Sequence, residues 1–166
     1  LSVLTEMEEQ INQQMSKLKK SEERFRQVAM TNWVWETDSD GRYTYCSENV
    51  VDSLGYSSQE MLGKTPFDFM PEEEAKRVAG LYRDIIRKRE AFAGLENINR
   101  HKAGHEVTLE TSGVPLFDDN GKFIGFRGID RDITKRKRAE SSLEKLNEEL
   151  EKRIEKRTVE LMETNR

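Results

Sequence analysis

The chain has 166 residues, of which 36% are charged and only 34% belong to the hydrophobic set, too lean a balance for one compact core along the whole length. Its formal net charge of −4 gives no indication of a nucleic-acid-binding surface, and no apolar run approaches the ~20 residues that span a bilayer. The single cysteine, Cys46, excludes an internal disulfide and suits a reducing cytoplasm.

Charged and aromatic residues are distributed unevenly along the chain. Residues 1–27 and 135–166 are dense in Glu, Lys, Arg and Gln, whereas both Trp and all four Tyr lie between positions 33 and 82. We therefore expect an N-terminal helix over 1–30, a domain over 31–134 and a C-terminal helix over 135–166.

The N-terminal arm carries apolar residues at strict seven-residue spacing: Leu4, Ile11, Leu18 and Phe25. The alternate seam positions are Leu1, Glu8, Met15 and Glu22. This 3-and-4 spacing is typical of a coiled coil, although two glutamates weaken the seam. The alternative is an amphipathic helix that packs on its own domain.

The central region reads as an α+β domain. Two strands joined by the turn cluster at 38–41 are followed by short helices that end at Gly55 and Gly63, with Ser47 and Ser57 as their predicted N-caps. The other predicted elements are strands at 33–37, 42–46, 92–100, 105–116 and 122–132 and a helix at 71–88. These elements predict a five-stranded antiparallel sheet with small helices on one face.

The C-terminal arm keeps a heptad spacing that changes part-way. Ala139, Leu143, Leu146 and Leu150 follow a 4-3-4 pattern, but Ile154 comes four residues later instead of three. Such a stutter locally unwinds a coiled coil. Two arms with the same periodicity favour a parallel homodimer with a marginal C-terminal coil.

Four basic residues, Lys135–Arg138, begin this arm. A solvated helix start is the favoured interpretation, and a nucleic-acid or lipid patch is the alternative.

The residues and their order resemble a PAS domain of the S-box kind. The stretches that carry the likeness are 33–38, 45–50, 54–64, 102–104 and 125–134. The resemblance implies a sensor whose sheet bends around a pocket, with signals leaving through the last strand into the next helix. The C-terminal arm resembles the helix that leads into sensor histidine kinases. We therefore expect a fused output domain beyond Arg166, and leave open a membrane span upstream.

Catalytic signatures are absent, so we expect no enzymatic activity from this segment. Gly63-Lys64-Thr65 resembles the end of a phosphate-binding loop, but Ser58 stands where the first glycine belongs and Pro66 would break the following helix. His101 and His105 flank a turn and lack the shared helical face of a metal-binding pair. No metal site is expected.

The resemblance also bears on cofactors. Haem-binding members of the family usually carry their ligand in the helix that corresponds to 71–88, and this helix has no histidine. Blue-light members use a cysteine where Pro66 stands here. Haem and a cysteinyl-flavin photocycle are thus disfavoured, while the cofactor itself stays unknown.

Period-2 alternation assigns one face of the sheet, and the resemblance identifies it as the pocket face. The candidate pocket residues are Trp35, Asn97, Asn99 and Thr111, since buried amides and hydroxyls need hydrogen-bond partners. Two interpretations remain. A flavin or small polar ligand binds in room left by Gly113 and Gly128, or aromatic side chains fill the core and no ligand binds.

Asp132 and Thr134 are the candidate relay residues at the exit from the last strand. We expect Asp132 to accept from a nearby Arg or Lys and Thr134 to cap the exit helix; the alternative is that both only form an N-cap. The overall prediction is a cytoplasmic, dimeric sensor that relays to an output domain. Its rival is a ligand-free PAS module for dimerisation or protein interaction.

Overall fold

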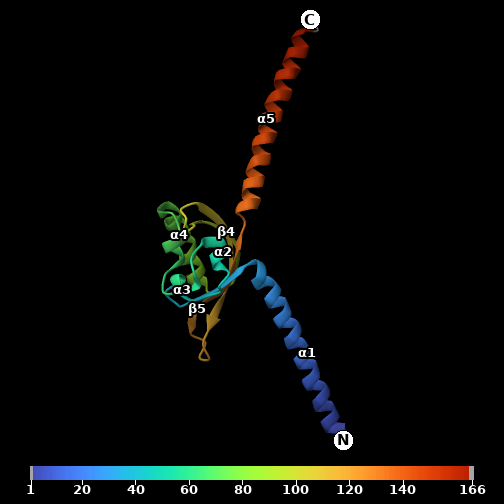
Figure 1. Ribbon diagram of the computed structural model, residues 1–166, viewed down its shortest axis with the longest axis vertical. Helices are drawn as coiled ribbons and strands as arrows, with labels where there is room; N and C mark the ends of the chain where they lie inside the picture. Colours follow the sequence, from blue (N-terminus) through green and yellow to red (C-terminus); the bar gives the residue numbers. More distant parts are fainter. Residues whose placement is uncertain (1, 165–166) are drawn as a thin grey trace.

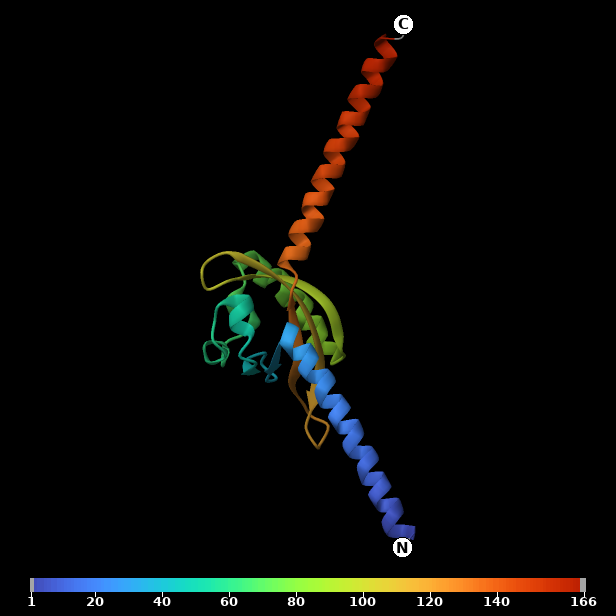
Figure 2. The same cartoon turned by 45° about the vertical axis from the view of Figure 1, so that its right-hand side comes forward.

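The two predicted arms form long helices in the computed structural model, which describes residues 2–164. Helix α1 spans Ser2–Thr31 and α5 spans Thr134–Thr164, and neither contains a glycine or proline that would break it. They leave the domain in opposite directions, so that the outer ends of the two helices lie far apart (Figures 1 and 2). Leu1 and residues 165–166 of the predicted arms lie outside the described residues. Within the described part, no helix is apolar enough over sufficient length to cross a membrane.

The central region forms the predicted five-stranded antiparallel sheet, in the order β2-β1-β5-β4-β3. The strands are β1 (Trp33–Thr37), β2 (Tyr43–Cys46), β3 (Phe92–Arg100), β4 (Glu106–Phe117) and β5 (Phe123–Asp132). Each lies within one residue of its predicted bounds. Alternating apolar residues and turn clusters therefore predicted the strands well.

Four helical segments cover one face of this sheet. They are α2 (Val50–Leu54), α3 (Ser58–Met61), the 3-10 helix η1 (Pro66–Phe69) and α4 (Glu72–Lys88). Gly55 ends α2 in the left-handed conformation, and Ser57 begins α3 with a capping box to Glu60, as the sequence predicts.

The predicted N-cap role of Ser47 is wrong. Helix α2 begins at Val50 and its N-cap position is Asn49. The Ser47 hydroxyl instead accepts from the Val34 backbone N–H at 2.8 Å and donates to Asn49 Oδ1 at 2.6 Å. It joins β1 to the loop before α2, a contact between segments 13 residues apart.

Helix α4 also protects the exposed edge of β3. Glu74 accepts from the Ile98 backbone N–H at 2.9 Å, and Arg77 donates to the Glu96 carbonyl at 2.9 Å. Edge strands expose unpaired backbone groups that invite unwanted pairing. These two side chains satisfy part of that edge.

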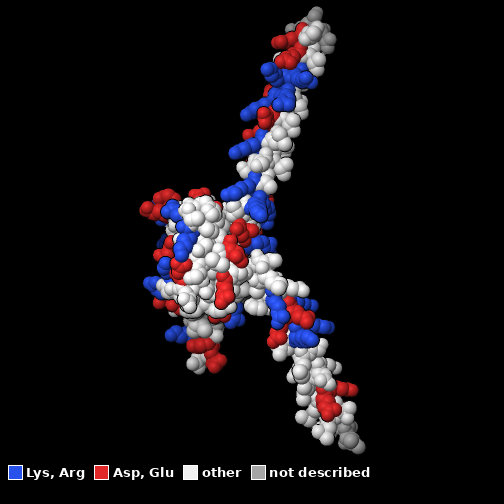
Figure 3. Space-filling view, viewed as in Figure 1, with Lys and Arg blue, Asp and Glu red and all other residues white. Residues whose placement is uncertain are grey.

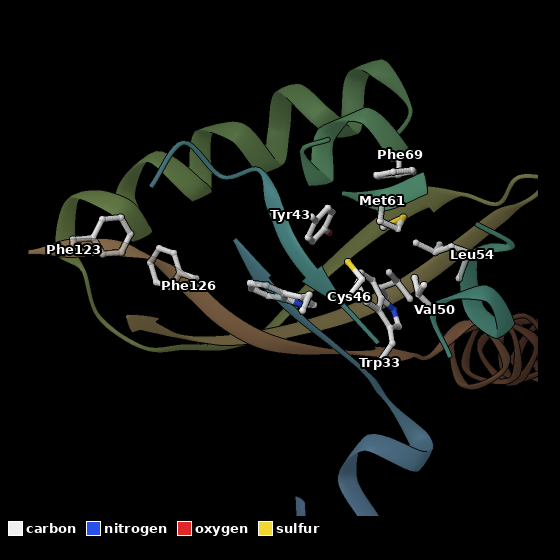
Figure 4. Close-up of a cluster of buried hydrophobic side chains, with 12 residues drawn as sticks. Trp33, Tyr43, Cys46, Val50, Leu54, Met61, Phe69, Phe123 and Phe126 are labelled. Atoms are coloured by element: carbon white, nitrogen blue, oxygen red, sulfur yellow. The ribbon is translucent and has the colours of Figure 1, made fainter. Parts of the chain in front are cut away.

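The core lies between the sheet and the helices, and Figure 4 shows its aromatic and sulfur-containing side chains pointing into this layer. Trp33, Val50 and Phe126 are almost completely buried. Cys46, predicted to be half-buried, is only 5% exposed. The core thus brings together residues from β1, β2, β4 and β5 and from the short helices.

Gly113 and Gly128 do not leave room for a ligand as predicted. They lie in one row across the sheet, between Trp35 on β1 and Phe92 on β3. A Cβ at Gly128 would come within 2.3 Å of both the Trp35 ring and the Ser112 carbonyl, and one at Gly113 within 2.9 Å of the Phe92 ring. The space above the glycines is therefore filled by these two rings.

Candidate functional site

A cavity lies between the inner face of the sheet and the helices η1 and α4. Its volume is about 50 Å³, and its walls are mostly aromatic and aliphatic. It is lined by Trp35, Thr37, Tyr43, Pro66, Phe67, Met70, Val78, Tyr82, Phe92, Leu95, Asn97, Asn99, Thr111 and Asp130. The four predicted pocket residues are all among these.

Asn99, Asn97 and Thr111 form a chain of hydrogen bonds along one wall of the cavity, and the donors all point the same way. Asn99 Nδ2 donates to Asn97 Oδ1 at 2.6 Å, and Asn97 Nδ2 donates to Thr111 Oγ1 at 2.8 Å. Thr111 lies directly opposite Asp130 on the neighbouring strand. Asp130 is 4% exposed, and its Oδ1 is buried without a hydrogen-bond partner. The polar chain thus runs towards a carboxyl group that is incompletely satisfied.

Burial dominates the electrostatics of Asp130. It raises the pKa of this carboxyl from 3.8 to about 7, and the nearby Thr111 hydroxyl and Trp35 indole only partly oppose the shift. Burial, with the Asp130 charge as a second cause, also raises the pKa of the Cys46 thiol to about 12. The pKa of Tyr43 is raised well above its usual value by burial first and Asp130 second. Near neutral pH, Asp130 is therefore the group in this part of the core that titrates.

At the end of β5, the contacts of Asp132 and Thr134 differ from those that the sequence predicts. Asp132 Oδ1 accepts from the Thr134 backbone N–H at 2.9 Å, and none of the ion pairs among residues 2–164 includes Asp132. The Thr134 hydroxyl accepts from the Thr108 backbone N–H at 3.0 Å, so it joins α5 to β4. Asp132 therefore supplies the cap-like contact predicted for Thr134.

Ion pairs that the sequence does not reveal connect α5 to the sheet. Glu96 and Glu110 lie directly opposite each other on β3 and β4, an unfavourable arrangement for two like charges. Lys137 pairs with Glu96 at 2.6 Å, while Arg136 lies 3.7 Å from Glu96 and 3.4 Å from Glu110. Arg131 adds a contact to Glu110 at 3.7 Å. Two members of the basic run at 135–138 thus offset the two glutamates.

The end of α1 is fixed to the domain by an amide. Asn49 Nδ2 donates to the Ala29 carbonyl at 2.8 Å and to the Asn32 carbonyl at 3.0 Å. Helix carbonyls at a C-terminus lack intrahelical donors. Asn49 supplies one from the loop before α2, so both arms have polar attachments to the domain.

The two histidines stack on each other across their turn. Their ring centroids are 4.2 Å apart, and His101 Nδ1 accepts from the Ala103 backbone N–H at 3.0 Å. This bond occupies one potential metal-ligating nitrogen.

The comparison with protein families agrees with this architecture. The PAS fold model matches residues 28–138, which includes the whole sheet, the cavity and the first turn of α5. The chain belongs to the PAS fold family. Its α+β fold with five antiparallel strands is the PAS fold that the sequence resemblance predicts.

Relatives of this PAS domain include named sensor proteins. The methanogenesis regulatory histidine kinase FilI of Methanothrix harundinacea is 30% identical over 139 residues, 82% of this chain and 15% of the relative. The methyl sulfide methyltransferase-associated sensor of Methanosarcina acetivorans is 34% identical over 126 residues, 74% of this chain and 12% of the relative. This chain therefore spans a small part of these curated relatives.

A solved structure supports the fold. A sensory box histidine kinase/response regulator structure from Burkholderia thailandensis superimposes with a TM-score of 0.63 at 22% identity. The match covers 78% of this chain and 98% of that one.

The cavity size limits which groups the PAS domain can hold in this conformation. Pockets for cofactors and drug-sized ligands typically measure about 300–1,000 Å³, far above the 50 Å³ found here. Trp35 and Phe92 occupy the space above the glycine row. In this conformation the cavity is therefore smaller than the pockets that typically hold a cofactor.

Proposed function

We propose that this chain is the sensory and relay segment of a longer signalling protein, in which a change in the PAS cavity is passed to α5. One observation carries the proposal. Thr111 and Asp130 line the cavity, and their neighbours Glu110 and Arg131 lie in the group of charges that contacts the start of α5.

The relay uses the alternation of side chains across a sheet. In each of three strands, one residue faces the cavity and an adjacent residue in the sequence faces the opposite side of the sheet. The pairs of neighbours are Asn97 with Glu96, Thr111 with Glu110, and Asp130 with Arg131. A small rotation of these strands on ligand binding changes both sides together. It therefore alters how Glu96 and Glu110 hold Arg136 and Lys137.

Asp132 and Thr134 take the relay roles in this mechanism. They fix the direction of the exit helix through the Asp132–Thr134 and Thr134–Thr108 contacts. Ile133 between them is buried and anchors the corner. A change in β4 or β5 thus moves the first turn of α5 rather than being absorbed by a flexible loop.

The arms form a parallel homodimer in this proposal. Their apolar seam residues are largely exposed in the single chain, with Ile11 52%, Leu18 61%, Leu146 51% and Ile154 65% exposed. Figure 3 shows an uncharged band along α5 beside its charged edge. A seam of this kind is covered when a second copy pairs with it. The stutter at Ile154 allows the C-terminal coil to change register or rotate.

A second feature of the molecule also fits a second copy. Phe25 of α1, 58% exposed, borders a hollow on the outer sheet face with Val34, Val114 and Ile129. Phe25 belongs both to this hollow and to the predicted α1 seam. Pairing of two chains along α1 would cover both.

The names of the relatives indicate the output. FilI and the aerobic respiration control sensor protein ArcB of Escherichia coli, 26% identical over 117 residues, are sensors or histidine kinases by name. We assign this chain to the same setting. The segments 1–30, 31–134 and 135–166 act there as input helix, PAS sensor and output helix, in the cytoplasm and fused to a kinase.

Hydrogen exchange tests the relay. The double variant Glu96→Gln with Glu110→Gln removes the acidic partners of α5, and we expect faster exchange in the first two turns of α5. The variant Glu90→Gln with Glu106→Gln is the matched control, since it removes equal charge from exposed residues that form no ion pair within the described chain. Equal exchange in both variants would refute the relay path.

Native mass spectrometry tests the assembly. A dimer at micromolar concentration is expected, and a monomer would refute the paired arms. The second candidate, a ligand-free interaction module, is favoured by the small cavity volume of about 50 Å³. It predicts a dimer without added mass whose α5 exchange does not change with any cavity ligand.

A further inference from the structure

The cavity has an unbalanced charge. Asp130 is its one acidic residue, and its lining contains no Lys, Arg or His among the described residues. An ionised carboxylate in such a place needs a partner, because burial of an unpaired charge costs several kcal/mol. The Thr111 hydroxyl and the Trp35 indole lie close enough to lower the pKa of this carboxyl, but neither of them carries a positive charge.

The hydrogen bonds indicate which kind of partner is missing. Because Asn99 donates to Asn97 and Asn97 donates to Thr111, the polar chain delivers donors towards Asp130. Asp130 Oδ1 still lacks a hydrogen-bond partner. In its ionised form the carboxyl accepts hydrogen bonds only, so a ligand that binds this form presents a donor to it.

The remaining walls favour an alkylated cation. Five aromatic side chains line the cavity: Trp35, Tyr43, Phe67, Tyr82 and Phe92. Aromatic faces attract cations, and recognition of substituted ammonium groups by several rings is a well-established use of this interaction. Apolar alkyl groups also gain from contact with Leu95, Val78 and Met70.

The volume sets the size of the ligand. One water-sized group needs about 10–15 Å³ on this scale, so a cavity of about 50 Å³ accepts roughly three to five non-hydrogen atoms. Di- and trimethylammonium have this size.

We propose that the PAS cavity binds a small alkylammonium cation, whose N–H donates to Asp130 and whose alkyl groups contact the surrounding aromatic rings. This inference rests on the proposed sensory function and names the class of its ligand. It assigns Asp130 as the charge-recognising residue and Phe67 as one aromatic wall.

Binding of a cation next to Asp130 is coupled to the protonation state of its carboxyl. The titratable groups that face Asp130 are Tyr43 and Cys46 from β2, with Tyr82 of α4 close to Tyr43. Burial raises the pKa of all three, so they stay neutral near pH 7. With the pKa of Asp130 at about 7, a bound cation displaces about half a proton per site at pH 7. Below pH 6 its affinity falls by about tenfold per pH unit.

Isothermal titration calorimetry of the full chain with trimethylammonium chloride tests the proposal. We expect saturable binding, with proton release measured in buffers of different ionisation enthalpy. The neutral probe 2-propanol, of the same number of non-hydrogen atoms, should bind at least about tenfold more weakly. Absence of binding at millimolar trimethylammonium, or equal binding of 2-propanol, would overturn the proposal.

Variants locate the site. Asp130→Asn should abolish trimethylammonium binding, whereas Asp119→Asn, an exposed turn residue with the same charge change, should leave it intact. Phe67→Leu should weaken binding about threefold to tenfold, which keeps a test available if Asp130→Asn does not fold. Unchanged affinity in Phe67→Leu would place the cation elsewhere.

The proposed function and this inference fail in different ways. The attachment of α5 on which the relay depends is measured without ligand, as faster α5 exchange in the Glu96→Gln/Glu110→Gln variant. Faster α5 exchange in that variant, together with no binding of trimethylammonium, would overturn the ligand class alone. Cation binding without any change in α5 exchange would overturn the relay alone.

Discussion

Replacement of Asp130 by asparagine should change how stability depends on pH. In the folded chain the Asp130 carboxyl keeps its proton up to about pH 7, whereas its usual pKa is 3.8. Between these values the folded state binds more protons than the unfolded state. The free energy of unfolding therefore falls as pH rises from about 4 to about 7.

The size of this effect follows from the shift. About three pKa units correspond to about 4 kcal/mol, at 1.36 kcal/mol per unit. Asparagine carries no such titration but keeps the shape of the side chain. As the pH rises from 4 to 8, the free energy of unfolding of the Asp130→Asn variant should thus increase by up to about 4 kcal/mol relative to that of the wild type. Any constant cost of the new amide is the same at both pH values.

Urea unfolding followed by tryptophan fluorescence measures this difference, because Trp33 and Trp35 are both buried next to β5. Each unfolding free energy is obtained at pH 4, 6 and 8 for the wild type, Asp130→Asn and Asp119→Asn. The last variant controls for net charge. A difference between wild type and Asp130→Asn that stays flat over this range would refute the argument that burial raises the pKa of the Asp130 carboxyl.

Three further predictions concern packing and pairing. Gly128→Ala should destabilise the domain by about 1–3 kcal/mol, because the added methyl meets the Ser112 carbonyl, whereas Gly80→Ala, with open space around it, should stabilise α4 by about 0.5–1 kcal/mol; thermal unfolding distinguishes the pair. Asn49→Ala should cost about 1–2 kcal/mol and speed hydrogen exchange in the last turn of α1, and unchanged exchange there would argue against its capping role. Leu150→Glu should convert a dimer to monomers in native mass spectrometry, while Ser141→Glu on the opposite side of the predicted seam should not; dissociation by both would show that the seam is misplaced.

Local sequence patterns determine the helices and strands of this protein and the face of the sheet on which each strand residue lies. The two helical arms follow from uninterrupted helix-forming sequence, and all five strands lie within one residue of their predicted bounds. Alternation correctly put Trp35, Asn97, Asn99 and Thr111 on one face, because side chains of a strand alternate strictly. Each of these features depends on residues close together in the chain.

The contacts that give the cavity and its exit their properties depend on residues far apart. Serine is a residue type that favours the N-cap position, but the Ser47 hydroxyl accepts a hydrogen bond from the Val34 backbone N–H because the pairing of β1 with β2 brings the two residues together. Alternation also places Asp130 on the cavity face, yet the lack of a hydrogen-bond partner for its Oδ1 follows from what β1 and β4 present beside it. Nothing in the sequence singles it out.

The attachment of α5 shows the same division. The basic run at its start is visible in the sequence, but its role was decided by the register that sets Glu96 opposite Glu110. A shift of one residue in that register would turn one glutamate to the cavity side, and Arg136 and Lys137 would lose their shared partner. The sequence by itself determined the elements and their faces, since these depend on neighbours along the chain. Only the tertiary structure decided which charges meet, because strand register and helix direction bring distant residues within a few ångströms.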